Sequence, residues 1–186
     1  MDKPGMLEHE ISRRRLLLGA SCLLAGGLLS APALASRSTT GRALNVFNLN
    51  TGERLEVSYW ENGRYLNDGL AELNHLFRDY RCNEVFNIDK RLFDQLFLLQ
   101  HKLGRRGEIQ LISGYRSPAT NRQKHRKSRG VAKRSYHTLG QAVDVRIPGV
   151  QLSHLHQAAL QLKVGGVGYY PRDNFVHLDT GPLRHW

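Results

Sequence analysis

Two short segments in the second half of the chain carry side chains that commonly bind metal ions. The first reads Ser-Tyr-His-Thr-Leu-Gly-Gln-Ala-Val-Asp over residues 135–144, and the second reads Phe-Val-His-Leu-Asp over residues 175–179. One neutral imidazole from each segment, His137 and His177, and the carboxylate of Asp144 would make a three-ligand site. Three protein ligands leave the fourth tetrahedral position open for water, which is the arrangement of catalytic zinc. The sequence therefore predicts one zinc site.

A second carboxylate follows the last of these histidines. Asp179 lies two residues after His177, and in a strand this spacing places both side chains on one face. A carboxylate at that position could take a proton from a water molecule at the metal, or it could hold the imidazole through a hydrogen bond. His154 and His156 are also two residues apart, but in a predicted helix they face different sides and cannot share a metal.

These motifs resemble those of a known group of enzymes. The pattern Ser-x-His-x-x-Gly-x-Ala-x-Asp at residues 135–144 resembles the first zinc motif of the lysostaphin, D-Ala-D-Ala-metallopeptidase and hedgehog group. The closing run at residues 165–186, with Gly-Val-Gly-Tyr-Tyr-Pro and Phe-Val-His-Leu-Asp-Thr-Gly-Pro, is similar to the MepK-type murein endopeptidases. The resemblance implies a zinc peptidase of the periplasm that hydrolyses peptide cross-links in peptidoglycan through a zinc-activated water. It also implies that the three ligands named above hold the ion.

The resemblance extends to a segment ahead of the first ligand. The group has Ser-Gly-Tyr-Arg-Ser there, which matches residues 113–117. Arg116 is suited to pairing with a substrate carboxylate or to polarising a peptide carbonyl, and a structural salt bridge is the alternative. We expect Arg116, Tyr115, Ser135 and Tyr170 to contact the substrate.

The general base is where this chain departs from the pattern. Relatives in the group often carry a His or Glu two or three residues before the last ligand, and this chain has Phe175 and Asn174 at those positions. Neither side chain can act as a base. The sequence therefore favours Asp179 as the base, with Asp173 on the preceding turn as the second choice.

The charge of the chain points to an anionic partner. Its 186 residues contain 27 Lys and Arg against 16 Asp and Glu, a net charge of +11. Basic side chains concentrate in one segment, at Arg122, Lys124, Arg126, Lys127, Arg129, Lys133 and Arg134. Peptidoglycan stem peptides carry carboxylates that such a segment would attract, and a solvated run that keeps the protein soluble is the alternative. Export makes a nucleic acid an unlikely partner.

The N-terminus has the features of an export signal. Arginines precede an apolar run that ends in Ala-Leu-Ala, so residues 1–35 are expected to form a signal peptide cut after Ala35. The pair Arg13 and Arg14 resembles the twin-arginine type. We expect a periplasmic protein without stable membrane association after cleavage, and an uncleaved anchor is the alternative. Cys82 is then the one cysteine left, so no intrachain disulfide is expected.

The remaining chain predicts one α+β domain over residues 43–186, after a flexible leader at 36–42. Alternating runs at 44–47 and 55–60 indicate an N-terminal β-hairpin, and strands are expected at 108–113, 142–147 and 175–178. Asn67-Asp68 and Asp89 are expected to cap two helices, and a further helix is predicted at 152–162. The segment 121–134 reads as a solvated loop or a frayed helix. The expected fold is a small antiparallel sheet that carries the zinc site and is flanked by helices.

Two other functions remain open from the sequence. A D-Ala-D-Ala carboxypeptidase would use the same ligands as an endopeptidase. A non-catalytic zinc-containing cell-wall binding module would explain the missing His or Glu base, but a structural zinc normally has a fourth protein ligand. The identity of the cut bond, D-Ala to diaminopimelate or diaminopimelate to diaminopimelate, also stays open, as does the oligomeric state.

Overall fold

The computed structural model describes residues 41–104, 107–128 and 130–186. The predicted signal peptide and most of the predicted leader lie outside these residues, although the first strand already begins at Gly41. Within the described part of the chain, no helix is long and apolar enough to cross a bilayer. The strands are β1 Gly41–Asn48, β2 Arg54–Glu61, β3 Arg64–Tyr65, β4 Ile109–Ser113, β5 Ala142–Arg146, β6 Gly166–Tyr170, β7 Phe175–Asp179 and β8 Arg184–His185. The helices are α1 Asn67–Leu76, α2 Lys90–Lys102, α3 Pro118–Lys127 and α4 Leu152–Leu162, with a 3-10 turn at Tyr136–Leu139.

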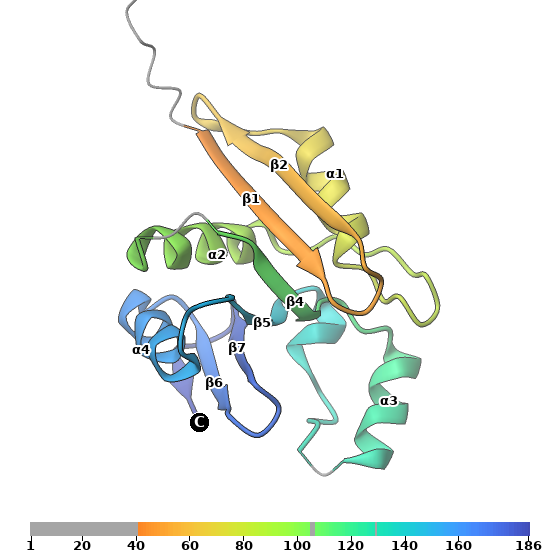
Figure 1. Ribbon diagram of the computed structural model, residues 1–186. Coiled ribbons are helices and arrows are strands. Elements are labelled where there is room, and N and C mark those ends of the chain that lie inside the picture. Colours follow the sequence, from red (N-terminus) through yellow and green to blue (C-terminus); the bar gives the residue numbers. More distant parts are fainter. Residues whose placement is uncertain (1–40, 105–106, 129) are drawn as a thin grey trace, which may run out of the picture. The chain divides into compact units, whose positions relative to one another are not determined.

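All of these strands join one sheet in the order β3-β2-β1-β4-β5-β7-β6-β8 (Figure 1). The pairs β1–β4 and β6–β8 are parallel, and the other neighbouring pairs are antiparallel. The α+β class is thus confirmed, but the small antiparallel sheet is wrong: the sheet is eight-stranded and mixed. The N-terminal hairpin does not stand apart, because β1 pairs with β4 and so continues the sheet that carries β5 and β7.

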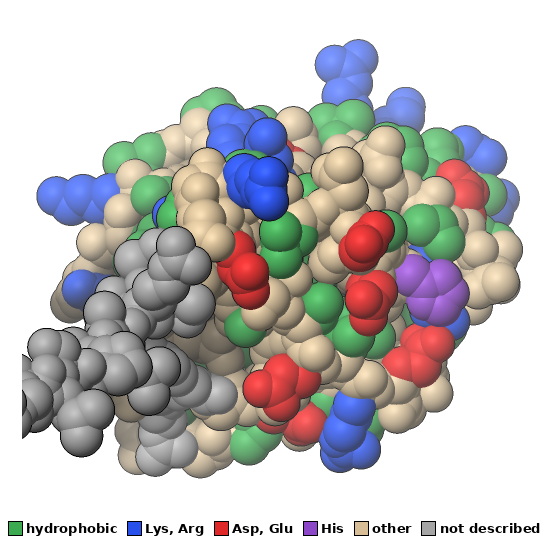
Figure 2. Space-filling model, turned by 90° about the horizontal axis from the view of Figure 1, so that it is seen from above, with side chains coloured by type: hydrophobic (Ala, Val, Ile, Leu, Met, Phe, Trp, Pro, Cys, Tyr) green, Lys and Arg blue, Asp and Glu red, His purple; other side chains and the backbone are tan. Residues whose placement is uncertain are grey.

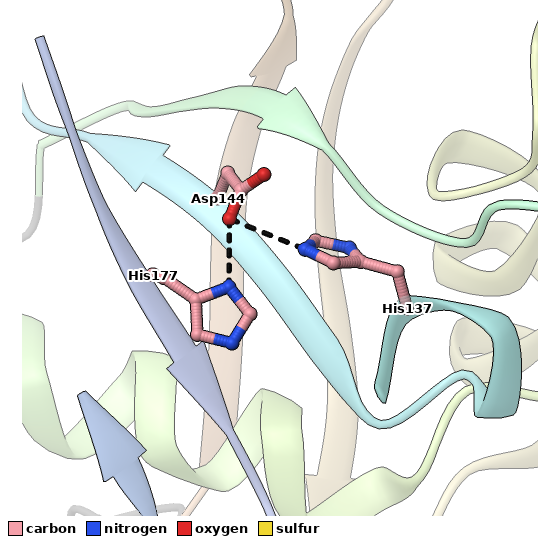
Figure 3. Close-up of side chains that lie close together, drawn as sticks. All are labelled: His137, Asp144 and His177. Carbon is pink, nitrogen blue, oxygen red and sulfur yellow. Dashed lines mark hydrogen bonds and ion pairs between the residues drawn. The ribbon is translucent and has the colours of Figure 1, made fainter. Parts of the chain in front are cut away.

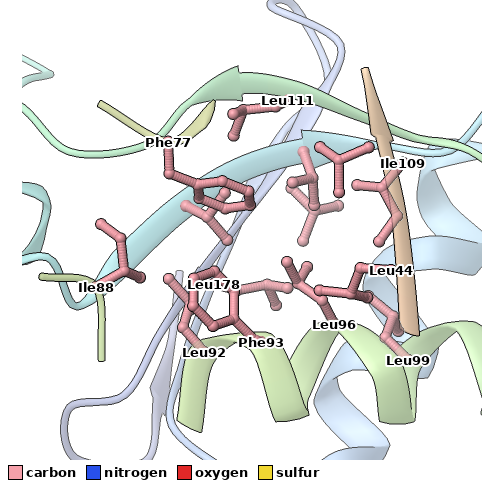
Figure 4. Close-up of a cluster of buried hydrophobic side chains, with 14 of the residues drawn as sticks. Leu44, Phe77, Ile88, Leu92, Phe93, Leu96, Leu99, Ile109, Leu111 and Leu178 are labelled. Atoms are coloured by element: carbon pink, nitrogen blue, oxygen red, sulfur yellow. The ribbon is translucent and has the colours of Figure 1, made fainter. Parts of the chain in front are cut away.

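Helix α2 lies against one face of this sheet and supplies much of the core (Figure 4). Its residues Leu92, Phe93 and Leu96 recur at helical spacing and are fully buried. The helix begins as the sequence predicts, because the Asp89 carboxylate accepts a hydrogen bond from the Arg91 backbone N at 3.0 Å. Helix α4 packs beside α2 and against β6 and β7. Its bounds are those predicted.

Helix α1 begins differently from the prediction. Its N-cap is Leu66, which makes no side-chain cap hydrogen bond, so the expected capping by Asn67 or Asp68 is wrong. Asp68 instead lies in the first helical turn, where a negative charge is favourable. A Cβ on Gly69 would lie 2.1 Å from the Ser58 carbonyl oxygen, so α1 approaches β2 more closely than a larger residue allows.

Helix α3 occupies the first half of the basic segment. The Ser117 hydroxyl caps it by accepting a hydrogen bond from the Thr120 backbone N at 3.2 Å, and Pro118 takes the first helical position, where its missing N–H costs nothing. The predicted frayed helix is therefore a capped helix of ten residues. It carries no acidic residue in its first turn and four basic residues in its last turn.

The other face of the sheet carries the polar side chains of interest. In β5, Val143 and Val145 are buried in the core, so alternation turns Asp144 to the opposite face.

Positive charge is not spread evenly over the surface. Acidic side chains gather on the face seen in Figure 2, which views the molecule from the side of the β1–β2 hairpin.

Candidate metal centre

Three side chains from three segments meet on the face of β5 and β7 that points away from the hydrophobic core (Figure 3). Asp144 in β5 and His177 in β7 are direct partners in the antiparallel ladder, so both project from the same face. His137 comes from the 3-10 turn, which Gly140 ends with a φ of 64°. The Asp144 Oδ1 atom lies 3.2 Å from His137 Nε2 and 2.8 Å from His177 Nδ1. One ligand atom from each residue lies within 4.8 Å of the others.

Each imidazole is anchored through its other nitrogen. His137 Nδ1 lies 2.7 Å from the Gly114 carbonyl oxygen, and His177 Nε2 lies 3.1 Å from Asp179 Oδ2. Asp144 Oδ1, on the other side of each ring, also only accepts hydrogen bonds, and a neutral imidazole carries one proton. With that proton on the anchored nitrogen, the lone pairs of His137 Nε2 and His177 Nδ1 face Asp144. Two lone pairs and a carboxylate oxygen repel one another unless a cation or a proton lies between them. The donor set therefore fits a metal ion.

The second oxygen of Asp144 is held by Arg116. The Arg116 Nη2 atom lies 2.6 Å from Asp144 Oδ2, and its Nε donates to the Ser113 hydroxyl at 2.9 Å. Burial alone would raise the pKa of Asp144, but His137, His177 and Arg116 outweigh it and hold the pKa well below its usual value. Asp144 is thus a fixed carboxylate anion. The structural salt bridge that the sequence left open for Arg116 is present.

The two imidazoles differ in their affinity for a proton. Burial lowers the pKa of His137 to about 4, so this ring is neutral at physiological pH. Burial also works to lower the pKa of His177, but hydrogen bonds to Asp144 and Asp179 outweigh it and raise the pKa above its usual value. A metal ion bound by this group would therefore have to displace a proton from His177.

Asp179 is fully buried on the far side of the His177 ring from the metal-binding atoms. Its Oδ1 accepts hydrogen bonds from the backbone N of Gly166 at 3.2 Å and of Gly181 at 2.9 Å. Arg184 donates to both carboxylate oxygens. Burial would raise the pKa of Asp179, but the bonds from His177 and Arg184 outweigh it and lower the pKa to about 2. Both carboxylate oxygens of Asp179 thus already accept hydrogen bonds from other residues.

The three ligand residues line a groove of about 870 Å³. Other residues along it include Ile112, Ser113, Arg116, Lys124, Ser135, Tyr136, Tyr170, Asp173, Phe175, Arg184 and Trp186, together with residues 128, 130–132 and 134. Three residues expected to contact substrate, Arg116, Ser135 and Tyr170, thus line the groove. Tyr115 is not among the lining residues: it is buried, donates its hydroxyl proton to Glu84 at 2.7 Å and stacks on Phe86.

Asp173 is exposed and lines the groove, and among the described lining residues it is the one carboxylate besides Asp144. Two lining residues, Arg184 and Trp186, were missed by the sequence reasoning. No local pattern indicates them, because they reach the groove through the pairing of β8 with β6. The short basic and aromatic run at residues 184–186 is the signal in the sequence that could have indicated them.

Two basic side chains of the basic segment, Lys124 and Arg134, line the groove. Burial, followed by the charges of Arg116 and Arg81, lowers the pKa of Lys124. The side chains of Arg122, Arg126 and Lys127 are exposed and do not line the groove. Arg129 lies outside the described residues.

Comparison with known proteins bears directly on this site. The sequence model of the family described as peptidoglycan L,D-endopeptidase MepK matches residues 36–186, which include both ligand segments. The chain belongs to the MepK family. The Escherichia coli K12 peptidoglycan L,D-endopeptidase MepK is 51% identical over 182 residues, covering 97% of this chain and 100% of that protein. The probable MepK of Haemophilus influenzae is 44% identical over 177 residues, covering 94% and 95%. No solved structure gives a significant match.

Membership of the MepK family confirms the resemblance drawn from residues 135–144 and 165–186 and identifies the chain as a peptidase. The match spans nearly the full length of both proteins, so the groove belongs to the part of the chain that the MepK proteins share.

Proposed function

We propose that this chain is an exported, zinc-dependent murein endopeptidase that cuts L,D cross-links. Two observations carry the proposal: the convergence of His137 Nε2, Asp144 Oδ1 and His177 Nδ1 in a groove, and membership of the MepK family. The carboxypeptidase and the binding module that the sequence left open have no support from these relatives, whose names specify an endopeptidase.

The donor set supports zinc as the metal. Two neutral imidazoles and one carboxylate, with a position left for water, match the ligands of catalytic zinc. Zinc bound there would supply a water of lowered pKa and would polarise the scissile carbonyl. The anchors on Gly114 and Asp179 fix the ring orientations of His137 and His177 before the metal binds.

The name of the relatives supports one of the two candidate bonds. In a diaminopimelate to diaminopimelate cross-link the carbonyl belongs to an L centre and the amine to a D centre, whereas in the D-Ala to diaminopimelate link both centres have the D configuration. The D centre on the amine side carries a carboxylate next to the scissile bond. Lys124 and Arg134 line the groove and are suited to pair with it.

Asp173 is the base that we propose, since it is exposed in the groove with no hydrogen bond among the described residues. The contacts of Asp179 favour the other role considered for it, because a buried carboxylate with both oxygens bonded and a pKa of about 2 is a poor proton acceptor. Asp179 then holds the His177 ring, and Arg116 holds Asp144.

The proposed location follows from the substrate. A protein that acts on peptidoglycan has to leave the cytoplasm, and residues 1–35 with Arg13 and Arg14 have the features of a twin-arginine signal. We propose that the domain works in the periplasm after cleavage at Ala35.

Digestion of purified muropeptide dimers tests the proposal. Dimers with either type of cross-link are incubated with the protein, with and without a zinc chelator, and products are identified by mass spectrometry. We expect chelator-sensitive conversion of diaminopimelate-linked dimers to monomers, and no conversion by a His137→Ala variant. A matched His154→Ala variant changes an exposed histidine on α4 and is expected to cleave normally. Dimers that persist with the parent protein would refute the endopeptidase.

A further inference from the structure

The last residues of the chain form an edge strand beside the metal centre. In β8, Arg184 pairs with Gly166 and His185 with Val167 of β6. The backbone of Trp186 continues this pairing, because its N donates to the Val167 carbonyl at 3.2 Å and its carbonyl accepts from the Tyr169 N at 3.0 Å. The C-terminus is marked beside β6 in Figure 1. The end of the chain is thus held in place by the sheet.

Arg184 is connected to a metal ligand through Asp179. Its Nη1 lies 3.0 Å from Asp179 Oδ1 and its Nη2 lies 2.7 Å from Oδ2, a two-point pairing that fixes the plane of the carboxylate. The same Oδ2 accepts from His177 Nε2 at 3.1 Å. Asp179 has 0% of its surface exposed, so in the folded protein its charge is balanced by protein partners, with Arg184 contacting both oxygens.

The guanidinium of Arg184 lies between two aromatic rings. Its Cζ is 4.8 Å from the ring centre of Tyr136 and 5.1 Å from that of Trp186. Tyr136 immediately precedes His137 in the 3-10 turn. Arg184 therefore contacts both of the segments that provide imidazole ligands, one through Asp179 and the other through Tyr136.

Trp186 packs directly on the His177 imidazole, the same ring that Asp179 anchors. Its ring centre is 5.3 Å from that of His177, and its Nε1 donates to the Tyr170 hydroxyl at 2.7 Å. Two glycines of β6 leave room for these contacts. A Cβ on Gly166 would lie 2.4 Å from Asp179 Oδ2, and a Cβ on Gly168 would lie 2.7 Å from the Trp186 ring. Because β6 has no side chain at these two positions, Asp179 and Trp186 can lie directly against its backbone.

We propose that Arg184 and Trp186 are positioning residues for the metal centre, which hold the His177 ring so that Nδ1 faces the ion. Arg184 acts through the Asp179 carboxylate, and Trp186 acts by packing on the ring. The inference rests on the proposed function, in which His177 is a zinc ligand. It assigns to the C-terminal segment a part in metal affinity that is separate from any contact with substrate.

The test measures zinc affinity in the purified protein by competition with a chelating dye. The variants are Arg184→Ala, Arg184→Lys and Trp186→Ala, with Leu183→Ala as the matched control. Leu183 lies in the same segment, is 66% exposed and does not line the groove. We expect Arg184→Ala and Trp186→Ala each to weaken zinc binding about tenfold, the lower end of the range for groups that orient metal ligands. Arg184→Lys should recover part of the loss, and Leu183→Ala should bind as the parent does.

Thermal unfolding of the metal-free proteins separates positioning from a loss of folding, and the visible spectrum of the cobalt-loaded proteins reports ligand geometry. Folded Arg184→Ala and Trp186→Ala proteins with parental zinc affinity and an unchanged cobalt spectrum would overturn the inference. If one of them does not fold, Arg184→Lys and Gly168→Ala, which displaces the Trp186 ring, decide the matter by the same readouts. A parent that binds no zinc would overturn the proposed function together with this inference. A parent that binds zinc without cleaving dimers would overturn the function alone.

Discussion

Asp144 and His177 face each other directly across the β5–β7 ladder, with Asp144 Oδ1 2.8 Å from His177 Nδ1. In the metal-free protein this short contact is favourable when the imidazole carries a proton on Nδ1. Asp179 on the other side of the ring adds to the effect, and the pKa of His177 is raised. A proton and a metal ion therefore compete for the same nitrogen.

Zinc affinity is expected to depend on pH through His177. Its raised pKa means that the proton is bound below that pKa and is lost as the pH rises through it, so zinc binding strengthens with rising pH and then levels off. Below that point the affinity should fall about tenfold per pH unit, the slope for one displaced proton. His137, with a pKa of about 4, is already neutral in the pH range of the measurement, so zinc displaces no second proton from it. Dye competition between pH 5 and 8.5 measures the slope, and a slope of two protons would contradict it.

Replacing Asp179 is expected to change acid stability. Its pKa of about 2 in the folded protein lies below its ordinary value of 3.8, so it contributes stability that is present above pH 4 and lost as the pH falls toward 2. That shift corresponds to roughly 2 kcal/mol. The Asp179→Asn protein should not show this loss of stability in acid. It should be less stable than the parent at pH 7, because the substitution removes the counter-charge of Arg184. Urea unfolding from pH 2 to 7 checks both, with the exposed Asp68→Asn as a control. Equal acid sensitivity in parent and Asp179→Asn would refute the prediction.

Asp173→Asn tests the proposed base. Because Asp173 lines the groove and does not touch the metal ligands, the change should lower kcat by about 10² to 10⁴, the usual contribution of a general base, and leave zinc affinity unaltered. Arg172→Gln, on the same exposed turn but outside the groove lining, is the control. Rates of muropeptide dimer cleavage at saturating substrate give kcat. An unchanged kcat in Asp173→Asn would exclude Asp173 as the base.

Substitution of Gly114 is expected to lower both the stability of the fold and the affinity for zinc. A Cβ there would lie 2.4 Å from the Phe77 carbonyl oxygen, and the Gly114 carbonyl anchors His137 Nδ1 at 2.7 Å. Gly114→Ala should therefore cost roughly 1–3 kcal/mol, as overpacking does, and should also weaken zinc binding. Gly107→Ala, where a Cβ meets nothing within 4 Å, should change neither property. Thermal unfolding and dye competition test the pair, and parental values for Gly114→Ala would contradict the prediction.

Local signals in the sequence were sufficient for several elements. The Asp89 cap and the apolar spacing after it predict α2, and Gly104, with a φ of 62°, follows the end of the helix. The bounds of α4 agree with the prediction over residues 152–162. Each of these depends on side chains within a few turns of one another, which is the range over which helix signals act.

The features that were missed depend on pairing between distant segments. The parallel pairing of β1 with β4 joins residues 46 and 109, and no local pattern specifies that partner. The same holds for β8, a two-residue strand that forms because β6 offers a free edge. At the site, the spacing of His177 and Asp179 correctly placed both on one face. The contact of Asp179 with Arg184, on which the proposed role of Asp179 as a ring anchor depends, was not predictable, because the position of Arg184 depends on β8.

The attachment of Trp186 to β6 has a consequence for how the protein is made and handled. The backbone bonds between Trp186 and residues 167 and 169 can form only in a chain that extends to residue 186. A product that stops before Arg184 would lack one wall of the groove while retaining every residue of the hydrophobic core. A segment fused directly after Trp186 would likewise extend from the rim of the groove, so a tag for purification belongs at the other end of the domain.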